Sequence, residues 1–307
     1  MRKLLFLFVV LAGVFAQQSE AQIVGYGYYA RGDADGDGKV SVSDLTTLID
    51  YLLNGEWQSP AESCETFVAN GVSFNMVKVE HGTFIMGNDN DASTGFTSSS
   101  PAHQVTLTKS YYIGQTEVTQ SLWSAVMGSN PSYYTRNGRG SHPVEWVTWN
   151  DCQTFISKLN EMTGLSFRLP TEAEWEFAAR GGNKSQGYIY SGSDAAGAVA
   201  WYVRNTLTGN TSTDVNESYP VALLFPNELG IYDMSGNVCE WVYDSTYGYK
   251  ADSPAVTDPI HDTNASRLYR GGSYDRPVGW CMVSNRSSLN PNSSSPNLGL
   301  RLALTAE

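Results

Sequence analysis

Residues 168–182 constrain the fold most strongly, because this segment encodes a helix together with signals for both of its ends. Thr171 and Glu174 have the spacing of a capping box, in which each side chain accepts a hydrogen bond from a free N–H group at the helix start. Gly181 and Gly182 follow, and glycine readily adopts the left-handed backbone that ends many helices. The segment therefore predicts a short helix with fixed boundaries.

Two further helices are expected upstream. The first runs over residues 119–127, starts at a threonine and stops at Gly128. The second runs over about residues 150–162 and stops at Gly164, because glycine readily adopts the left-handed conformation of a helix cap. One face of the second helix carries side chains that predict packing onto a core: Cys152, Phe155, Ile156 and Leu159.

Apolar residues that alternate with small ones predict short strands at residues 76–79, 82–87 and 103–107. The chain also contains 29 Gly, 8 Trp, 18 Tyr and 11 Phe but only 19 Lys and Arg. This composition predicts a compact, aromatic-rich domain with many turns, long loops and few charged helices.

Residues 1–21 have the form of a secretory signal peptide. Arg2 and Lys3 precede an apolar run that ends near Ala16, and small residues follow as cleavage sites. The run is too short to span a bilayer, so we expect the mature chain to be exported without a transmembrane anchor. A formal net charge of −12 excludes a nucleic-acid partner, since phosphate binding requires a concentrated basic surface.

Residues 33–44 have the spacing of a calcium-binding loop. Gly38 at the sixth position permits the sharp turn that lets several carboxylates converge on one cation, and an amphipathic helix is expected behind the loop. The alternative is a solvated acidic turn. The expected ligands are Asp33, Asp35, Asp37, Lys39, Ser41 and Asp44.

Residues 22–56 resemble a type I dockerin repeat, with the calcium loop followed by a helix that ends near Gly55. The resemblance implies calcium-dependent docking to a cohesin-like protein partner. Dockerins usually carry two such repeats and one is visible here, so a calcium-stabilised spacer is the alternative. A polar linker is expected over residues 57–72.

The larger domain, residues 73–307, resembles the formylglycine-generating, or sulfatase-modifying factor, family. The resemblance covers about residues 71–304. It implies a C-type-lectin-like α+β fold with little regular secondary structure. Six strings in family order carry it: residues 82–87, 142–151, 168–182, 230–238, 270–273 and 297–301.

The resemblance implies that catalytic members are copper-dependent oxidases, which use two cysteines to convert a sulfatase cysteine into formylglycine. Soft thiolates suit monovalent copper. The first family position holds Arg276 in this chain and the second holds Cys281, with Ser273 as a further catalytic candidate. We therefore expect the oxidase activity to be lost; an active enzyme that binds copper and a sulfatase is the alternative.

Four cysteines in an exported chain allow up to two disulfides in three pairings. Cys239 stands where the family usually has Trp, and it is the candidate partner of Cys281. The two form either a novel pair of copper ligands or a disulfide. A disulfide is the commoner outcome in an oxidising compartment. Cys64 and Cys152 would then form the other pair.

The resemblance also implies a second calcium site. Asp233 and Glu240 would supply side-chain oxygens, and Gly236 and Val238 would supply carbonyl oxygens, which are the donors that calcium prefers. The alternative is an ordinary turn beside Trp241.

A stretch rich in Ser, Asn and Tyr indicates a different class of function. Residues 284–295, with Tyr274 and Asp275, have the composition of recognition loops, whose side chains offer adaptable hydrogen bonds. A lectin-like module that binds a protein or a glycan-related ligand is therefore the alternative to an enzyme. A polar loop without a ligand would have the same composition.

Overall fold

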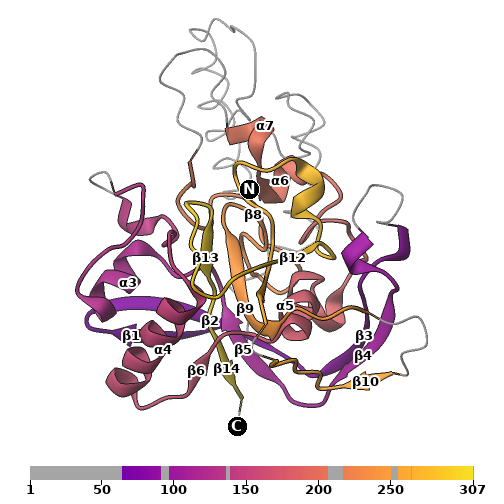
Figure 1. Ribbon diagram of the computed structural model, residues 1–307, viewed down its shortest axis with the longest axis horizontal. Coiled ribbons are helices and arrows are strands. Elements are labelled where there is room, and N and C mark those ends of the chain that lie inside the picture. Colours follow the sequence, from indigo (N-terminus) through magenta and orange to yellow (C-terminus); the bar gives the residue numbers. More distant parts are fainter. Residues whose placement is uncertain are drawn as a thin grey trace, which may run out of the picture.

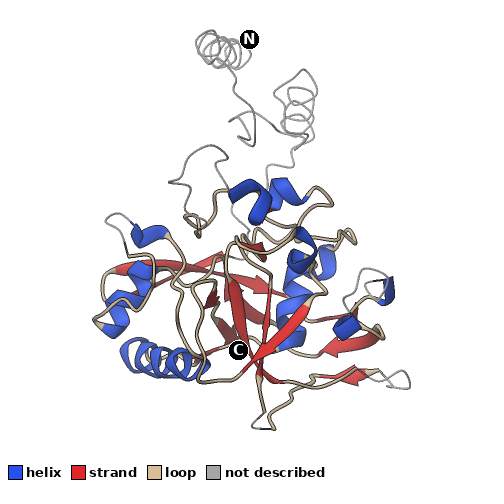
Figure 2. Cartoon of the chain, turned by 45° about the horizontal axis from the view of Figure 1, so that its top comes forward, coloured by secondary structure: helices blue, strands red, loops and turns tan. Residues whose placement is uncertain are grey.

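The computed structural model shows an α+β domain in which strands lie in the middle and helices lie around them (Figure 2). The expected signal peptide, calcium loop and dockerin-like helix lie outside the described residues. Within the described part, no helix is both long and apolar enough to cross a bilayer. The described residues are 64–90, 97–135, 139–206, 217–249, 255–263 and 265–306.

The central sheet begins with a hairpin of β1 and β2. Its turn residues Asn70 and Gly71 have φ of 46° and 82°, and Asn-Gly is the pair that type I′ hairpin turns favour. The linker expected over residues 57–72 is therefore too long, because residues 64–69 already pair in this sheet. The sheet has the order β1 (Cys64–Ala69), β2 (Val72–Val79), β5 (Tyr111–Gly114), β14 (Ala303–Thr305) and β6 (Phe167–Arg168).

The three expected helices are confirmed, with boundaries shifted by one or two residues. The Thr119 side chain caps the first, and Thr148 caps the second. Thr171 and Glu174 form the expected capping box of the third. The helices are α3 (Gln120–Met127), α4 (Trp149–Thr163), α5 (Glu172–Ala179), α6 (Ala196–Val199) and α7 (Val203–Thr206).

Two apolar cores form on opposite faces of the central sheet, because successive side chains of a strand point to opposite sides. Val77 and Val79 of β2 share a core with Ile113 of β5 and with Trp175 of α5. Met76 belongs to the other core, which α3 and α4 complete. Figure 1 shows α3 and α4 together beside β1.

Three smaller sheets complete the fold. The first joins β3 (Gly82–Met86), β4 (His103–Leu107) and β10 (Val256–Thr257). The second has the order β12 (Arg286–Leu289), β11 (Arg267–Arg270), β9 (Cys239–Ser245) and β13 (Leu298–Leu300). The third pairs β7 (Ala200–Trp201) with β8 (Ser235–Gly236). Strands β2, β3 and β4 confirm the three that the sequence predicts.

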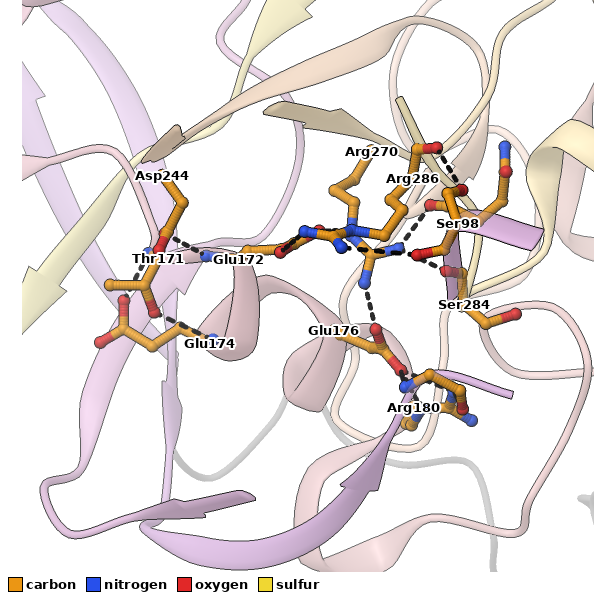
Figure 3. A network of polar contacts seen from close by, with 12 residues as sticks. Ser98, Thr171, Glu172, Glu174, Glu176, Arg180, Asp244, Arg270, Ser284 and Arg286 are labelled. Carbon is orange, nitrogen blue, oxygen red and sulfur yellow. Dashed lines mark hydrogen bonds and ion pairs between the residues drawn. The ribbon is translucent and has the colours of Figure 1, made fainter. Parts of the chain in front are cut away.

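A buried network of charges anchors α5 (Figure 3). Glu172 accepts two hydrogen bonds from Arg286, at 2.7 and 2.6 Å. Glu176 pairs with Arg270 and also accepts from Arg180 at 2.6 Å. All of these carboxylates are fully buried, and buried charges are tolerated only when they are paired and hydrogen-bonded. The helix that the sequence defines best is therefore also fixed by ion pairs to β11 and β12.

Candidate functional site

The structure brings Cys239 and Cys281 together at Ser273. Cys239 starts β9, and Cys281 ends the 3-10 helix η6 (Val278–Cys281). The Ser273 hydroxyl lowers the pKa of the Cys239 thiol, and the Ser273 backbone lowers that of the Cys281 thiol, so both cysteines lie at this residue. Both cysteines are buried. Three of the predicted site residues therefore meet, although they are distant in sequence.

Burial disfavours the thiolate form of both cysteines. Removal from water raises the pKa of Cys239 to about 12, although the Ser273 side chain opposes this shift. Burial also raises the pKa of Cys281 well above its ordinary value, and the neighbouring Cys239 adds to the effect. Because the thiolate is the reactive and metal-binding form, the pair in this state is a poor nucleophile and a poor ligand.

Asp275 and Asn297 extend the site beyond the thiols. The Ser273 hydroxyl donates to Asp275 at 2.7 Å, and the Asn297 amide donates to both Ser273, at 3.3 Å, and Asp275, at 2.8 Å. The Asn297 carbonyl accepts from the Cys239 backbone N–H at 2.8 Å. The sequence did not single out Asn297, although the string at residues 297–301 contains it.

Arg276, which the resemblance places at the first cysteine position of the family, has a side chain that is 46% exposed. Its guanidinium lies 5.2 Å from the centre of the Trp280 ring and 3.9 Å from an Asp275 oxygen. A guanidinium donates hydrogen bonds and does not ligate metals. Arg276 therefore cannot serve as a copper ligand in place of a cysteine.

The expected disulfides are not formed in this structure, where all four cysteines are free thiols. Cys152 on α4 is buried in the core that α3 and α4 complete. Cys64 at the start of β1 is only partly buried and packs against the core that contains Trp175, so these two cysteines belong to different clusters.

The residues expected to hold a second calcium ion are close together but are engaged with other groups. Both carboxylate oxygens of Glu240 accept from Arg301, and one also accepts from Trp175 at 2.6 Å. Asp233 accepts from the backbone of Ala222 at 2.7 Å. Across the described residues, no group of three or more His, Cys, Asp or Glu side chains is arranged to hold a metal ion. A cation here would have to displace the guanidinium from Glu240.

Glu117 adds a third buried acid, which the sequence did not indicate. Its oxygens accept from the Val238 backbone at 3.1 Å and from the Asn237 amide at 3.0 Å. Burial, with Asp233 and Glu240 nearby, raises its pKa well above the usual range of a carboxyl group. Burial likewise raises the pKa of Asp233 to about 6. The cluster thus contains more acidic side chains than Arg301 alone can neutralise, which favours the protonated form of Glu117.

Only part of the Ser- and Asn-rich stretch is available as a recognition loop. Ser284 and Asn285 are buried, and their carbonyls accept from Arg270. Residues 286–289 form β12, and Asn290 and Asn292 beyond it are exposed. The prediction for residues 284–295 is therefore wrong for Ser284 and Asn285, which support the charge network.

Comparisons with known proteins agree with this fold. The model of the sulfatase-modifying factor enzyme 1-like domain matches residues 65–306. The chaperone protein LppX of Paenibacillus barcinonensis is 33% identical, over 78% of this chain and 92% of its own length. The formylglycine-generating enzyme of Streptomyces coelicolor is 38% identical, over about half of each chain, 55% in both cases.

Among solved structures, Treponema denticola variable protein 1 superposes with a TM-score of 0.68 at 28% identity, over 79% of this chain and 99% of its own. This similarity agrees with the α+β, C-type-lectin-like architecture that the sequence implied. The family model covers most of the chain, and the strands and the capped α5 helix lie where the matched strings predict them. The chain therefore belongs to the formylglycine-generating, or sulfatase-modifying factor, family.

Proposed function

We propose that this protein is a ligand-binding member of its family that lacks the cysteine-pair oxidase activity. One observation carries the proposal: Arg276 occupies the first cysteine position, so that Cys281 has no partner thiol there. The remaining thiols support it, because Cys239 and Cys281 are buried and burial raises the pKa of both. The relative that matches over 92% of its length bears the name of a chaperone, not of an oxidase.

Export and calcium binding are further parts of this proposal. The basic and apolar start of the chain supports export, and the donor spacing of residues 33–44 supports one calcium ion in the N-terminal loop. We restrict the calcium proposal to that loop, because Glu240 is engaged with Arg301 at the other candidate position. Calorimetric titration of the full chain with calcium tests this, with Asp35→Ala as the variant expected to lose binding.

The test of the main proposal is a copper titration in the presence of a cysteine-containing sulfatase peptide. The full chain should not convert the peptide cysteine into formylglycine, as read by peptide mass. A copper-dependent conversion that Cys281→Ser abolishes would overturn the proposal. A family member with both cysteines, run in parallel, shows that the assay conditions support turnover.

A copper-loaded form is the second candidate, and one specific contact favours it. Cys239 and Cys281 both reach Ser273, so two soft sulfur atoms already share one site. Metal binding would have to release both thiol protons, so affinity for monovalent copper should rise steeply with pH. Binding without turnover would still agree with a loss of the oxidase function.

A further inference from the structure

Two aromatic side chains form an exposed stacked pair beside the loop that follows β12. The rings of Tyr133 and Trp146 lie 5.4 Å apart with an angle of 27° between their planes. Tyr133 is 63% exposed and Trp146 is 42% exposed. Single exposed aromatic residues are common, but two in contact form a contiguous apolar patch of the kind that marks binding surfaces. We call this pair the aromatic platform.

A fully buried carboxylate holds the platform in place. The two Glu145 oxygens accept from the backbone N–H groups of Tyr133, at 3.0 Å, and Tyr134, at 2.9 Å. The Glu145 backbone N–H in turn donates to the Ser132 hydroxyl at 3.2 Å. Burying a carboxylate costs free energy, and here its hydrogen bonds serve to fix an exposed loop against Trp146. The platform is therefore preorganised.

Trp146 itself has a strained backbone. Its φ is 64°, in the left-handed region that bulky residues rarely adopt, at a cost of about 1–2 kcal/mol. Its backbone N–H donates to the Ser295 carbonyl at 3.0 Å, which locks this conformation. Asn or Gly would occupy the position with less strain. An exposed, strained tryptophan indicates that the ring itself is needed.

The loop bonded to Trp146 is polar, and residues 290–297 contain no charged side chain. Asn292, from the loop bonded to Trp146, accepts a hydrogen bond from the Asn150 amide at 2.6 Å, and Asn290 in the same loop is exposed. Arg139, which lies over the Tyr134 ring, is paired with Glu217. A ligand would thus meet flat aromatic faces flanked by amides and hydroxyls.

The backbone N–H groups of the platform and of Tyr134 already donate hydrogen bonds within the protein. The N–H groups of Tyr133 and Tyr134 donate to Glu145, and that of Trp146 donates to Ser295. An extended peptide that binds by strand addition needs free backbone groups on its receptor. These three positions offer no donor to such a peptide.

We propose that the aromatic platform binds an uncharged oligosaccharide, a ligand class that deepens the proposed binding function and rests on it. A pyranose ring presents a face of C–H groups, which can lie flat on Trp146 or Tyr133, and a rim of hydroxyls, which can bond to Asn290 and its neighbours. The loop at residues 290–297 has no cationic side chain and Arg139 is paired with Glu217, which disfavours acidic glycans.

Calorimetric titration of the full chain with cellohexaose, chitohexaose and mannohexaose tests this proposal. At least one should bind, and Tyr133→Ala should weaken its affinity at least about tenfold. Phe225→Ala is the matched control, because Phe225 is also an exposed aromatic residue but its backbone N–H bonds to Ala198, away from the platform. The Phe225→Ala variant should bind the same oligosaccharide as tightly as the wild type does.

Trp146→Asn separates binding from folding. Asn tolerates the left-handed backbone, so this variant should unfold at the same or a higher temperature than the wild type while its oligosaccharide affinity is lost. The proposal is overturned if none of the three hexasaccharides binds more tightly than about 1 mM. It is also overturned if Trp146→Asn binds as the wild type does, or if a sulfated hexasaccharide binds more tightly than the neutral ones. None of these three results bears on the oxidase activity, which the copper assay tests separately.

Discussion

Buried hydrogen-bonded side chains support both the α5 network and the thiol site. The network around α5 is complete, whereas the thiol site has an arginine where a cysteine is expected. Around α5, the fully buried Glu172 and Glu176 have guanidinium partners from β12 and β11. At the thiol site, the supporting Ser273, Asp275 and Asn297 are joined by hydrogen bonds, yet an exposed arginine stands where the resemblance implies the first cysteine. The difference teaches that the scaffold of this family can stay intact while its reactive positions change.

The largest expected effect is at the scaffold. Arg270→Ala would leave Glu176 with a buried carboxylate that has lost its partner from β11, and breaking a buried pair in this way costs about 3–5 kcal/mol. The change should lower the free energy of unfolding by that amount in urea titrations, or abolish soluble expression. A loss below about 1 kcal/mol would mean that the network does not hold the fold.

A smaller effect should appear as a pH dependence. Burial, with Glu172 nearby, raises the pKa of Asp244 to about 7 from an ordinary 3.8. The folded state therefore keeps a proton that the unfolded state releases, so stability should fall as pH rises from about 4 to about 7, by at most about 4 kcal/mol. Urea unfolding across this pH range measures it.

Asp244→Asn is the control for this titration. It cannot lose a proton, so the difference in unfolding free energy between the wild type and this variant should shift in favour of the variant as pH rises through that range. Parallel curves for the two proteins would assign the pH dependence to other groups.

The thiol site should respond more weakly. Cys239→Ala removes one buried sulfur, which should cost about 1 kcal/mol because a free cysteine behaves as a small apolar residue. If Cys239 were instead bridged to Cys281, the same change without reductant would cost about 2–5 kcal/mol. Thermal unfolding in the presence and absence of reductant distinguishes the two, and mass spectrometry of unreduced peptides checks the bridge directly.

The smallest effect is expected at Arg276. Its contact with Asp275 at 3.9 Å is exposed, and exposed ion pairs contribute about 0–1 kcal/mol. Arg276→Ala should therefore leave the unfolding midpoint nearly unchanged, in contrast to Arg270→Ala. A large loss would show that this arginine has joined the scaffold, and the contrast between the two regions would fail.

Local signals predicted the elements whose boundaries depend on short-range chemistry. The threonine caps and terminal glycines placed α3, α4 and α5, and alternation placed β3 and β4. The two-residue strands β7 and β8 have no such pattern, because their pairing depends on contacts between Ala200 and Ser235 that lie far apart in sequence.

The candidate site also has a part that the sequence predicted and a part that only the folded chain shows. Family strings identified Cys239, Cys281 and Ser273, and the structure brings them together. Spacing could not reveal that Glu240 is engaged with Arg301 or that Glu145 supports Tyr133, since those contacts depend on the folded chain. The φ of Trp146 was equally hidden, because a tryptophan is not expected to adopt a left-handed backbone.

The strand order of the central sheet determines when, during translation, the sheet can be completed. β14 lies between β5 and β6, although it is the last strand to emerge during translation. Until residues 303–305 are made, β5 and β6 each present an unpaired edge, which other chains can pair with. A nascent chain should therefore need protection from aggregation until nearly the whole domain has been synthesised.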